Sequence, residues 1–343
     1  MSKNTRKDKI VLIRRVAGIA LLLVLVIGVA LRVNQIRISN DRVAKYEQLQ
    51  SLNPNKASAR AEAETEPTEA PVEDEATAET DPTEAAEPET TEEADEKASA
   101  CVQAFPAQPV TILTAAAAPN NETNSSDERV FQDDFEELYK INPDLVGWID
   151  VGNYMSMPVV YKDNSFYLDH DYYGNPDNAG TLFINEANTI WPDGDTPADQ
   201  NLLFHGHNMR DGSIFGDLDD YRNVDYMQKN VIVYFRTIYD YDPIPYVIFA
   251  AFDMSATPGE AGYFDVGYIN FDDDAEFEEY TSSVIRRSFF NMPYGVARND
   301  RMLTLLTCSY SNENGRYVLF CRALHEDETV ESILARANEI TKK

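Results

Sequence analysis

The feature that most constrains the fold of this chain is an acidic, low-complexity segment in its N-terminal third. Between Glu62 and Glu96 the sequence has sixteen acidic residues, no Lys or Arg and no aromatic residue. Such a segment buries too little apolar surface to offset the entropy lost on ordering, and its like charges extend it. We therefore expect residues 34–128 to form a disordered acidic linker rich in Glu, Thr, Ala and Pro, with the folded domain over residues 129–343.

The acidic segment also accounts for about half of the formal net charge of -30. A surface that binds nucleic acid needs clustered Lys and Arg to neutralise phosphates. We therefore expect no nucleic-acid partner.

The N-terminal end has the pattern of a membrane anchor. Val16 to Leu31 contains no charged residue, and several Lys and Arg residues precede it. A membrane-spanning helix needs about 20 residues, which Arg15 and Arg32 can extend by reaching toward the headgroups. The positive-inside rule then predicts a cytoplasmic N-terminus at 1–15, a transmembrane signal anchor at 16–33 and an extracellular folded domain. A cleaved signal peptide is the alternative, and it would export the same domain.

The remainder of the chain alternates short apolar runs with turn signals. Helical spacing of Phe131, Phe135 and Leu138 predicts a helix over Val130 to Ile141. Eight strand-like runs follow, at Val146–Ile149, Met157–Tyr161, Thr181–Ile184, Asn201–Phe204, Val231–Phe235, Tyr246–Phe252, Met302–Thr307 and Tyr317–Leu324.

Two further helices are predicted from Asp273 to Phe289 and from Thr329 to Ile340, where apolar residues again recur on one face. The pattern therefore predicts a mostly β domain, a barrel or a sandwich of about eight strands, with peripheral helices.

Cys308 is the first candidate for chemistry, because it ends an apolar strand-like run. A buried cysteine is usually an inert small hydrophobe. The polar neighbours Thr307 and Ser309 instead indicate a strand end that reaches an open site. The chain has three cysteines, an odd number that does not indicate a disulfide framework. Cys321 lies in the middle of a strand-like run and is expected to be a core residue.

Two histidines and an arginine could complete a site with Cys308. His205 and His207 share strand parity, so either could face the same groove, and their spacing does not choose between them. Arg316 heads a strand-like run eight residues after Cys308, which fits two neighbouring strands joined by a loop. A thiol, an imidazole and a guanidinium supply the nucleophile, acid/base and positive charge that acyl transfer requires.

The other candidates are weaker. His170 lies in an acidic, surface-like context, and His325 follows the last strand, so neither is expected to be catalytic. The consecutive aspartates from Asp272 to Asp274 lack the alternation of a calcium loop, and no Cys/His spacing resembles a zinc site. We therefore expect no metal and no cofactor.

Four segments resemble one known family. Thr304–Cys308 reads TLLTC and resembles the TLxTC signature of sortases, the membrane-anchored cysteine transpeptidases of Gram-positive bacteria. Gly206–Phe215 reads GHNMRDGSIF and is similar to the GHNMxDGSxF segment of class B sortases. Asn142–Ile149 resembles the entry segment of that class, as does Pro158–Val160 followed by Tyr167–Gly174.

This resemblance implies an eight-stranded sortase-type β-barrel with a catalytic triad of His207, Cys308 and Arg316. It selects His207 over His205, whose position holds Tyr in many class B sortases. We also expect Thr307, Ser309 and Asn208, which flank the triad in sequence, to contact substrate.

The implied reaction is transpeptidation. The enzyme would cleave an NPxTN-like sorting signal of a surface protein after Thr, form a thioacyl-enzyme, and pass the protein to an amino group of a peptidoglycan precursor (lipid II). Three alternatives remain: a pilus-polymerising sortase whose acceptor is a protein Lys, a cysteine hydrolase that uses water, and a non-catalytic wall-spacing protein.

Overall fold

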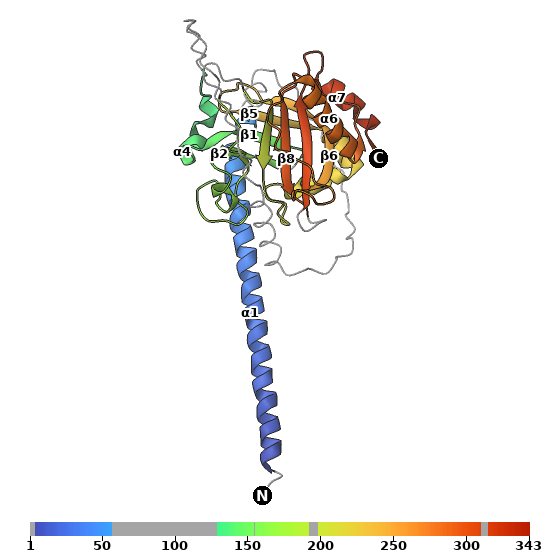
Figure 1. Cartoon of the computed structure of the whole chain (residues 1–343). Helices are drawn as coiled ribbons and strands as arrows, with labels where there is room; N and C mark the ends of the chain where they lie inside the picture. The colour runs from blue at the N-terminus through green and yellow to red at the C-terminus, as the bar shows by residue number, and fades with distance from the viewer. Residues whose placement is uncertain (1–3, 57–128, 154, 192–197, 310–314) are drawn as a thin grey trace, which may run out of the picture. The chain divides into compact units, whose positions relative to one another are not determined.

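The computed structural model describes residues 4–56, 129–153, 155–191, 198–309 and 315–343, with side chains from residue 24 onward. It divides into two compact units, Met1–Ser51 and Leu52–Lys343 (Figure 1). Most of the predicted linker, residues 57–128, lies outside the described residues, and so does Cys101.

The first unit consists of helix α1, Asn4–Ser51. The predicted membrane anchor at 16–33 falls within it, and the part at 16–23 lies outside the residues whose side chains are described. Among the described residues, no helix has an apolar stretch long enough to cross a membrane, and charged residues recur from Arg32 onward. The predicted single-pass topology stays a prediction. Residues 34–51 are helical, where the sequence predicted the start of a disordered linker.

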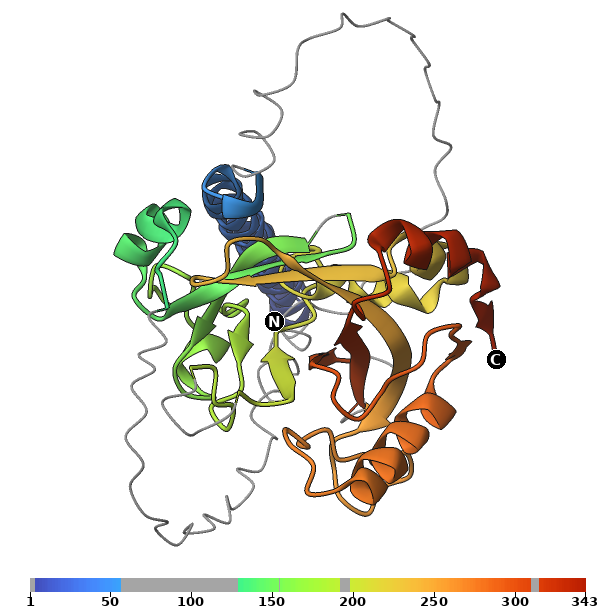
Figure 2. The same cartoon turned by 90° about the horizontal axis from the view of Figure 1, so that it is seen from above.

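Eight strands of the second unit close into a barrel in the order β1-β2-β3-β4-β8-β9-β6-β5 (Figure 2). The predicted mostly β fold with eight barrel strands is thereby confirmed. The strands are β1 (Leu145–Val151), β2 (Met155–Tyr161), β3 (Phe183–Ile184), β4 (Asn201–His205), β5 (Ile232–Thr237), β6 (Ile244–Ser255), β8 (Met302–Cys308) and β9 (Gly315–Ala323).

Two neighbouring pairs in the barrel are parallel, β2 with β3 and β4 with β8, and the others are antiparallel. A parallel pair needs a long crossover between its strands. The crossover from β4 to β8 contains β5 and β6, with helices before and after them. Strands that are a hundred residues apart in sequence thus lie side by side where the candidate Cys and His are found.

Strand β8 is buried along its whole length because both of its faces are covered. All seven of its residues are buried. Leu306 belongs to a hydrophobic cluster on one face, together with Val318 of β9 and Val284 of a helix that packs outside the barrel. Leu305 and Leu303, on the other face, are fully buried as well. Continuous burial explains why this strand lacks the polar alternation of a half-exposed strand.

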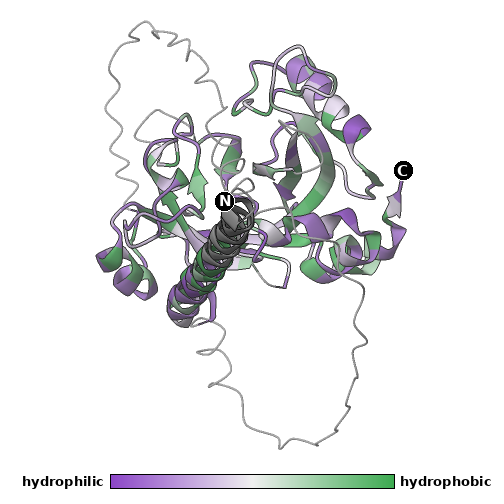
Figure 3. Ribbon diagram, turned by 90° about the horizontal axis from the view of Figure 1, so that it is seen from below, coloured by the Kyte–Doolittle hydropathy of each residue, from purple (hydrophilic) through white to green (hydrophobic). Residues whose placement is uncertain are grey.

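The covering helix is α6, Asp274–Arg287, and its ends agree closely with the prediction. Asp273 caps the N-terminus by accepting the Glu276 amide at 2.9 Å. Arg286 and Arg287 lie in the last turn, where positive charge is favoured. Phe277, Tyr280, Thr281 and Val284 form the buried face. In Figure 3 the strands of the barrel are mainly green, whereas the helices carry purple on part of their surface.

The predicted first helix is a 3-10 turn, η1 (Asp133–Phe135), followed by α4 (Glu136–Ile141). The predicted last helix is α7 (Val330–Arg336) followed by η4 (Ala337–Glu339). The sequence did not predict the remaining elements, which are η2 (Phe166–Leu168), η3 (Gly216–Arg222), α5 (Val224–Lys229) and a two-stranded sheet of β7 (Phe290–Asn291) and β10 (Thr341–Lys342).

Residues that follow Leu52 belong to the barrel unit. Asn53 donates its side-chain amide to Ser156 Oγ at 2.9 Å, and Asn55 donates to Asp150 Oδ2 at 2.6 Å. Both contacts lie on the β1–β2 pair. The folded domain therefore includes chain that precedes residue 129, and experiments on it are best made with the full chain.

Candidate active site

Cys308 and Arg316 are neighbours on adjacent strands. Cys308 is the last residue of β8, Arg316 is the second residue of β9, and the two are antiparallel register partners. Residues paired in this way point to the same face, with Cβ atoms about 4.5–5.5 Å apart. Their side chains are 3% and 1% exposed. The structure thus brings together the thiol and the guanidinium that the sequence placed on two strands joined by a loop.

His207 lies beside Cys308 because the parallel contact between β4 and β8 continues past the end of β4. Gly206 N donates to Leu306 O at 3.3 Å, and Asn208 Nδ2 donates to Cys308 O at 2.9 Å. His207, between these two residues, is therefore held next to the end of β8. It is buried.

The imidazole of His207 is oriented by a backbone carbonyl. Its Nε2 lies 2.8 Å from Leu168 O. A carbonyl oxygen only accepts, so Nε2 carries a proton, and Nδ1 is the nitrogen that gains or loses one. Gly180 packs directly against this carbonyl. Its φ is +64°, and a Cβ there would lie 2.3 Å from Tyr167 O and 2.9 Å from Leu168 O. Only glycine allows so close an approach in that conformation.

His205 has a different environment from His207. It is paired with Leu306, so it is on the same face of the sheet as Cys308, and its ring stacks on Phe183 at 5.1 Å. Its Nε2 lies 2.9 Å from Asn185 Nδ2. The orientation of that amide is fixed because Asn185 Oδ1 accepts the Ala187 amide at 2.9 Å. Asn185 therefore donates to Nε2, and the proton of the neutral His205 ring sits on Nδ1.

Burial lowers the pKa of His205 to about 3, and the nearby positive charge of Arg316 adds to the effect. His205 is consequently a neutral residue whose basic nitrogen already accepts a hydrogen bond. His205 is therefore poorly suited to proton transfer, and the assignment of His207 stays a prediction from the resemblance to class B sortases.

The residues expected to contact substrate are engaged inside the protein. Thr307 points to the face opposite Cys308, and its Oγ1 donates to Gly206 O at 2.8 Å. Asn208 uses its side-chain amide on Cys308 O and on Asp219 Oδ2. Ser309 Oγ accepts from Arg222 at 3.2 Å.

These contacts do not support substrate binding by Thr307, Ser309 or Asn208. All three side chains instead hold the backbone around Cys308. Asp219 and Arg222 were missed in the sequence, where only their spacing of three residues hinted at an ion pair.

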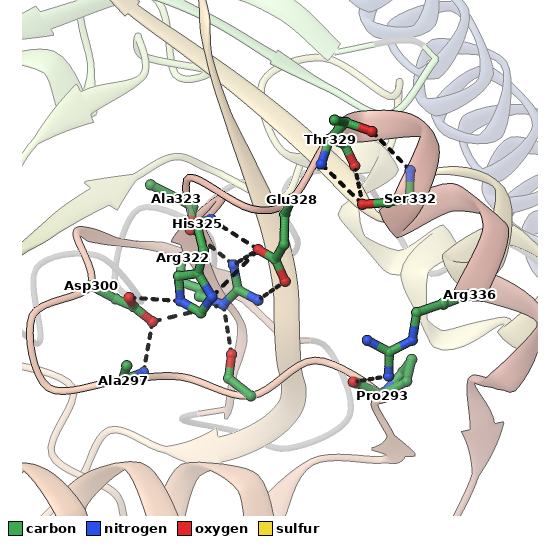
Figure 4. Close-up of polar contacts among 11 residues, drawn as sticks. Pro293, Ala297, Asp300, Arg322, Ala323, His325, Glu328, Thr329, Ser332 and Arg336 are labelled. Carbon is green, nitrogen blue, oxygen red and sulfur yellow. Dashed lines mark hydrogen bonds and ion pairs between the residues drawn. The ribbon is translucent and has the colours of Figure 1, made fainter.

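Among the described residues, Cys321 and the other two histidines lie away from this arrangement. Cys321 is fully buried on the face opposite Arg316, and burial raises the pKa of its thiol, which keeps it uncharged. His170 stacks on Phe166 at 4.2 Å and contacts Asp169. His325 contacts Asp300 at 2.9 Å in a polar cluster at the far end of β9 (Figure 4). The core position predicted for Cys321 is thus observed.

Within the part of the chain that the structure describes, no group of three or more His, Cys, Asp or Glu side chains is arranged to hold a metal ion.

Comparison with known proteins identifies relatives of this chain. No protein-family profile matches it. It is 31% identical to sortase B of Listeria monocytogenes over 197 residues, which cover 55% of this chain and 73% of that protein. It is 28% identical to sortase B of Staphylococcus aureus over 196 residues, which cover 55% of this chain and 74% of that protein.

The fold also has a counterpart among solved structures. The crystal structure of sortase B from Bacillus anthracis in complex with AAEK2 superposes with a TM-score of 0.50 at 21% identity, over 70% of this chain and 99% of that one. The sequence match to the Listeria protein is the stronger of the two findings, because it exceeds 30% identity over nearly three quarters of that relative. On this evidence the chain belongs to the class B sortases, a family of cysteine transpeptidases.

Proposed function

We propose that Cys308, His207 and Arg316 catalyse the transfer of a sorting-signal-bearing surface protein to an amino group of a peptidoglycan precursor. The observation that carries this proposal is the register pairing of Cys308 with Arg316, with His207 held beside the same strand end. The peptide signal, NPxTN-like and cleaved after Thr, follows from the likeness to class B sortases.

In the first half of the reaction, the Cys308 thiolate attacks the carbonyl carbon of the signal threonine. A bond forms between Sγ and that carbon, and the carbonyl oxygen becomes an oxyanion. Arg316 offers a permanent positive charge on the same face, which stabilises that oxyanion. The peptide bond then breaks, and the leaving amine takes a proton from His207. A thioester between Cys308 and the threonine remains.

The proton leaves from Nδ1 of His207, since Nε2 is held by Leu168 O. In the second half, the acceptor amine attacks the thioester carbonyl and gives its proton to Nδ1. The bond from carbon to Sγ breaks, which restores the thiolate. The new amide joins the surface protein to the acceptor, and His207 ends as it began, protonated for the next cycle.

The test uses the full chain with fluorogenic NPxTN-like and LPxTG-like peptides, each with and without an amine acceptor. Cys308→Ala and His207→Ala serve as matched variants. We expect cleavage of NPxTN-like peptides by the wild type, an amine-linked product, and no turnover by Cys308→Ala. Turnover by Cys308→Ala close to that of the wild type would refute the proposal.

The same assay separates the alternative acceptors. Cleavage that gives only the free acid, unchanged by added amines, would make the protein a hydrolase. A product formed only with a protein Lys would make it a pilus-type polymerase.

A further inference from the structure

Arg222, the last residue of η3, joins four groups around the end of β8. Its Nε donates to Asp219 Oδ1 at 3.0 Å. Its two terminal nitrogens bind the carboxylate of Asp253 in a fork, at 2.6 and 2.7 Å. Nη2 also donates to Ser309 Oγ at 3.2 Å, and the guanidinium lies 4.1 Å from the ring centre of Tyr317.

Through these contacts Arg222 reaches the backbone on both sides of the Cys308 thiol. Ser309 is the next residue along the chain. Its backbone N–H donates to Gly315 O at 2.9 Å, which continues the β8–β9 pairing past Cys308. On the other route, Asp219 accepts from Asn208 at 3.1 Å, and Asn208 donates to the carbonyl of Cys308. One side chain therefore anchors both the carbonyl of Cys308 and the residue that follows it.

Arg222 acts from the reverse side of the strand pair. Its partner Asp253 is in register with Tyr317, which is in register with Thr307. Neighbours along a strand point to opposite faces. Asp253, Tyr317 and Thr307 therefore point to the face opposite Cys308 and Arg316. A substrate that reacts with the thiol meets the other face, and any effect of Arg222 on the reaction has to pass through the backbone.

We infer that Arg222 is a positioning residue for the Cys308 nucleophile. The inference rests on the proposed function, in which Cys308 attacks the signal. Arg222 holds the backbone carbonyl of Cys308 and the side chain of Ser309 in fixed positions relative to each other. The Cys308 thiol therefore stays aligned with His207 and Arg316. A misplacement of about 1 Å of a reacting group costs on the order of 100-fold in rate.

The chemistry of the side chain favours arginine at this position over any other residue. Its planar fork presents five N–H donors, and here it serves two carboxylates and a hydroxyl at once. A lysine keeps the positive charge but is a single point donor that cannot span these three acceptors. Arg222→Lys therefore separates the geometry of the side chain from its charge.

The experiment compares wild type, Arg222→Lys and Arg236→Lys in the full chain. Arg236 is the matched control: it is buried on β5, two strands from β9, and forks onto Asp134 at 2.7 and 3.2 Å. Folded protein is first separated by gel filtration. Turnover of an NPxTN-like peptide is then normalised to the amount of Cys308 that a thiol reagent labels in this fraction, and peptide mapping keeps Cys101 and Cys321 out of the count. Thermal unfolding is measured beside it.

For Arg222→Lys we expect kcat per reactive thiol to fall about 10-fold to 100-fold with KM nearly unchanged. For Arg236→Lys we expect a lower unfolding temperature with kcat per reactive thiol within about twofold of the wild type. An unchanged kcat per thiol in Arg222→Lys, or an equal loss in both variants, would overturn the inference. If Cys308→Ala were itself active, the proposed function would fail instead.

A double-mutant cycle of Arg222→Lys with Ser309→Ala tests the route through Ser309. Should Arg222→Lys fold poorly, the milder single changes Ser309→Ala and Asp219→Asn test the inference on their own. Ser309→Ala removes the hydroxyl that accepts from Arg222. Asp219→Asn weakens the contact of Arg222 with residue 219 but keeps an acceptor oxygen there. If Arg222 acts through Ser309, the rate losses of Arg222→Lys and Ser309→Ala combine less than additively. Fully additive losses, or a wild-type rate in both Ser309→Ala and Asp219→Asn, would contradict the inference.

Discussion

Cys308 and Arg316 face each other across β8 and β9 as register partners, which fixes a thiol and a permanent positive charge on one face of the same strand pair. The arrangement needs no loop to close, because the backbone pairing itself sets the spacing.

Arg316 should matter through its geometry as well as its charge. Arg316→Ala removes both and is expected to lower kcat by about 100-fold to 1,000-fold, as loss of an oxyanion donor does. Arg316→Lys keeps the charge and should retain more activity than Arg316→Ala. Peptide turnover by the two variants, with unfolding temperatures beside it, checks the order. Equal activity of Arg316→Ala and wild type would remove this residue from the mechanism.

Gly180 should affect catalysis from outside the triad. In Gly180→Ala the new methyl group meets Tyr167 O and Leu168 O, which shifts the carbonyl that holds Nε2 of His207. Gly174→Ala is the matched control, because its φ of +77° is as demanding but no atom lies within 4 Å of the new Cβ. Each variant pays about 1 kcal/mol of backbone strain.

Both variants should yield less folded protein than the wild type. Only Gly180→Ala should also have a lower turnover rate per folded molecule. Measured rates per titrated thiol would decide the matter, and equal rates in the two alanine variants would show that Leu168 does not orient His207.

His205 should make the fold less stable in mild acid. Its pKa is about 3 when folded, against an ordinary value of 6.5. As the pH falls below 6.5, the unfolded chain binds a proton that the folded chain cannot bind until about pH 3, so stability is complete above 6.5 and declines below it. From pH 7 to pH 5 this amounts to about 2 kcal/mol.

His205→Gln cannot take up that proton and should lose less stability than wild type over the same range. Urea unfolding at pH 7, 6 and 5 measures the difference. Parallel curves for the two proteins would mean that His205 titrates normally in the folded state.

Glu328 should stabilise the fold in a different pH window. It forks onto buried Arg322 in the cluster of Figure 4, and that hydrogen-bonded pair lowers its pKa from 4.5 to about 2. Its contribution is therefore present above pH 4.5 and is lost as the pH falls from there toward 2. Glu328→Gln should flatten the stability curve over that range, whereas Glu326→Gln, an exposed neighbour, should not. Equal acid sensitivity in wild type and Glu328→Gln would contradict this.

Local sequence patterns predicted the barrel well. Alternation and turn residues located all eight strands, and apolar spacing placed α6 within two residues at either end. The position of Cys321 in the middle of a strand-like run correctly indicated a core residue. These features depend on neighbours in the sequence, which a pattern can show.

The contacts that organise the site could not be predicted in this way. Leu168 O meets His207 from 39 residues away, and Arg222 meets Ser309 from 87. Both depend on how loops cross the barrel, which no local pattern encodes. For the same reason the hydroxyls of Thr307 and Ser309 were expected to meet substrate, although they bond inward.

The measurement that tests the central claim most directly is the intact mass of the protein after a short incubation with an NPxTN-like peptide. We predict an added mass equal to the peptide up to its threonine, mapped to Cys308, and discharged when an amine acceptor is added. Cys321 should carry no adduct. An adduct that persists in Cys308→Ala, or one that maps to Cys321, would contradict the assignment of Cys308 as the nucleophile.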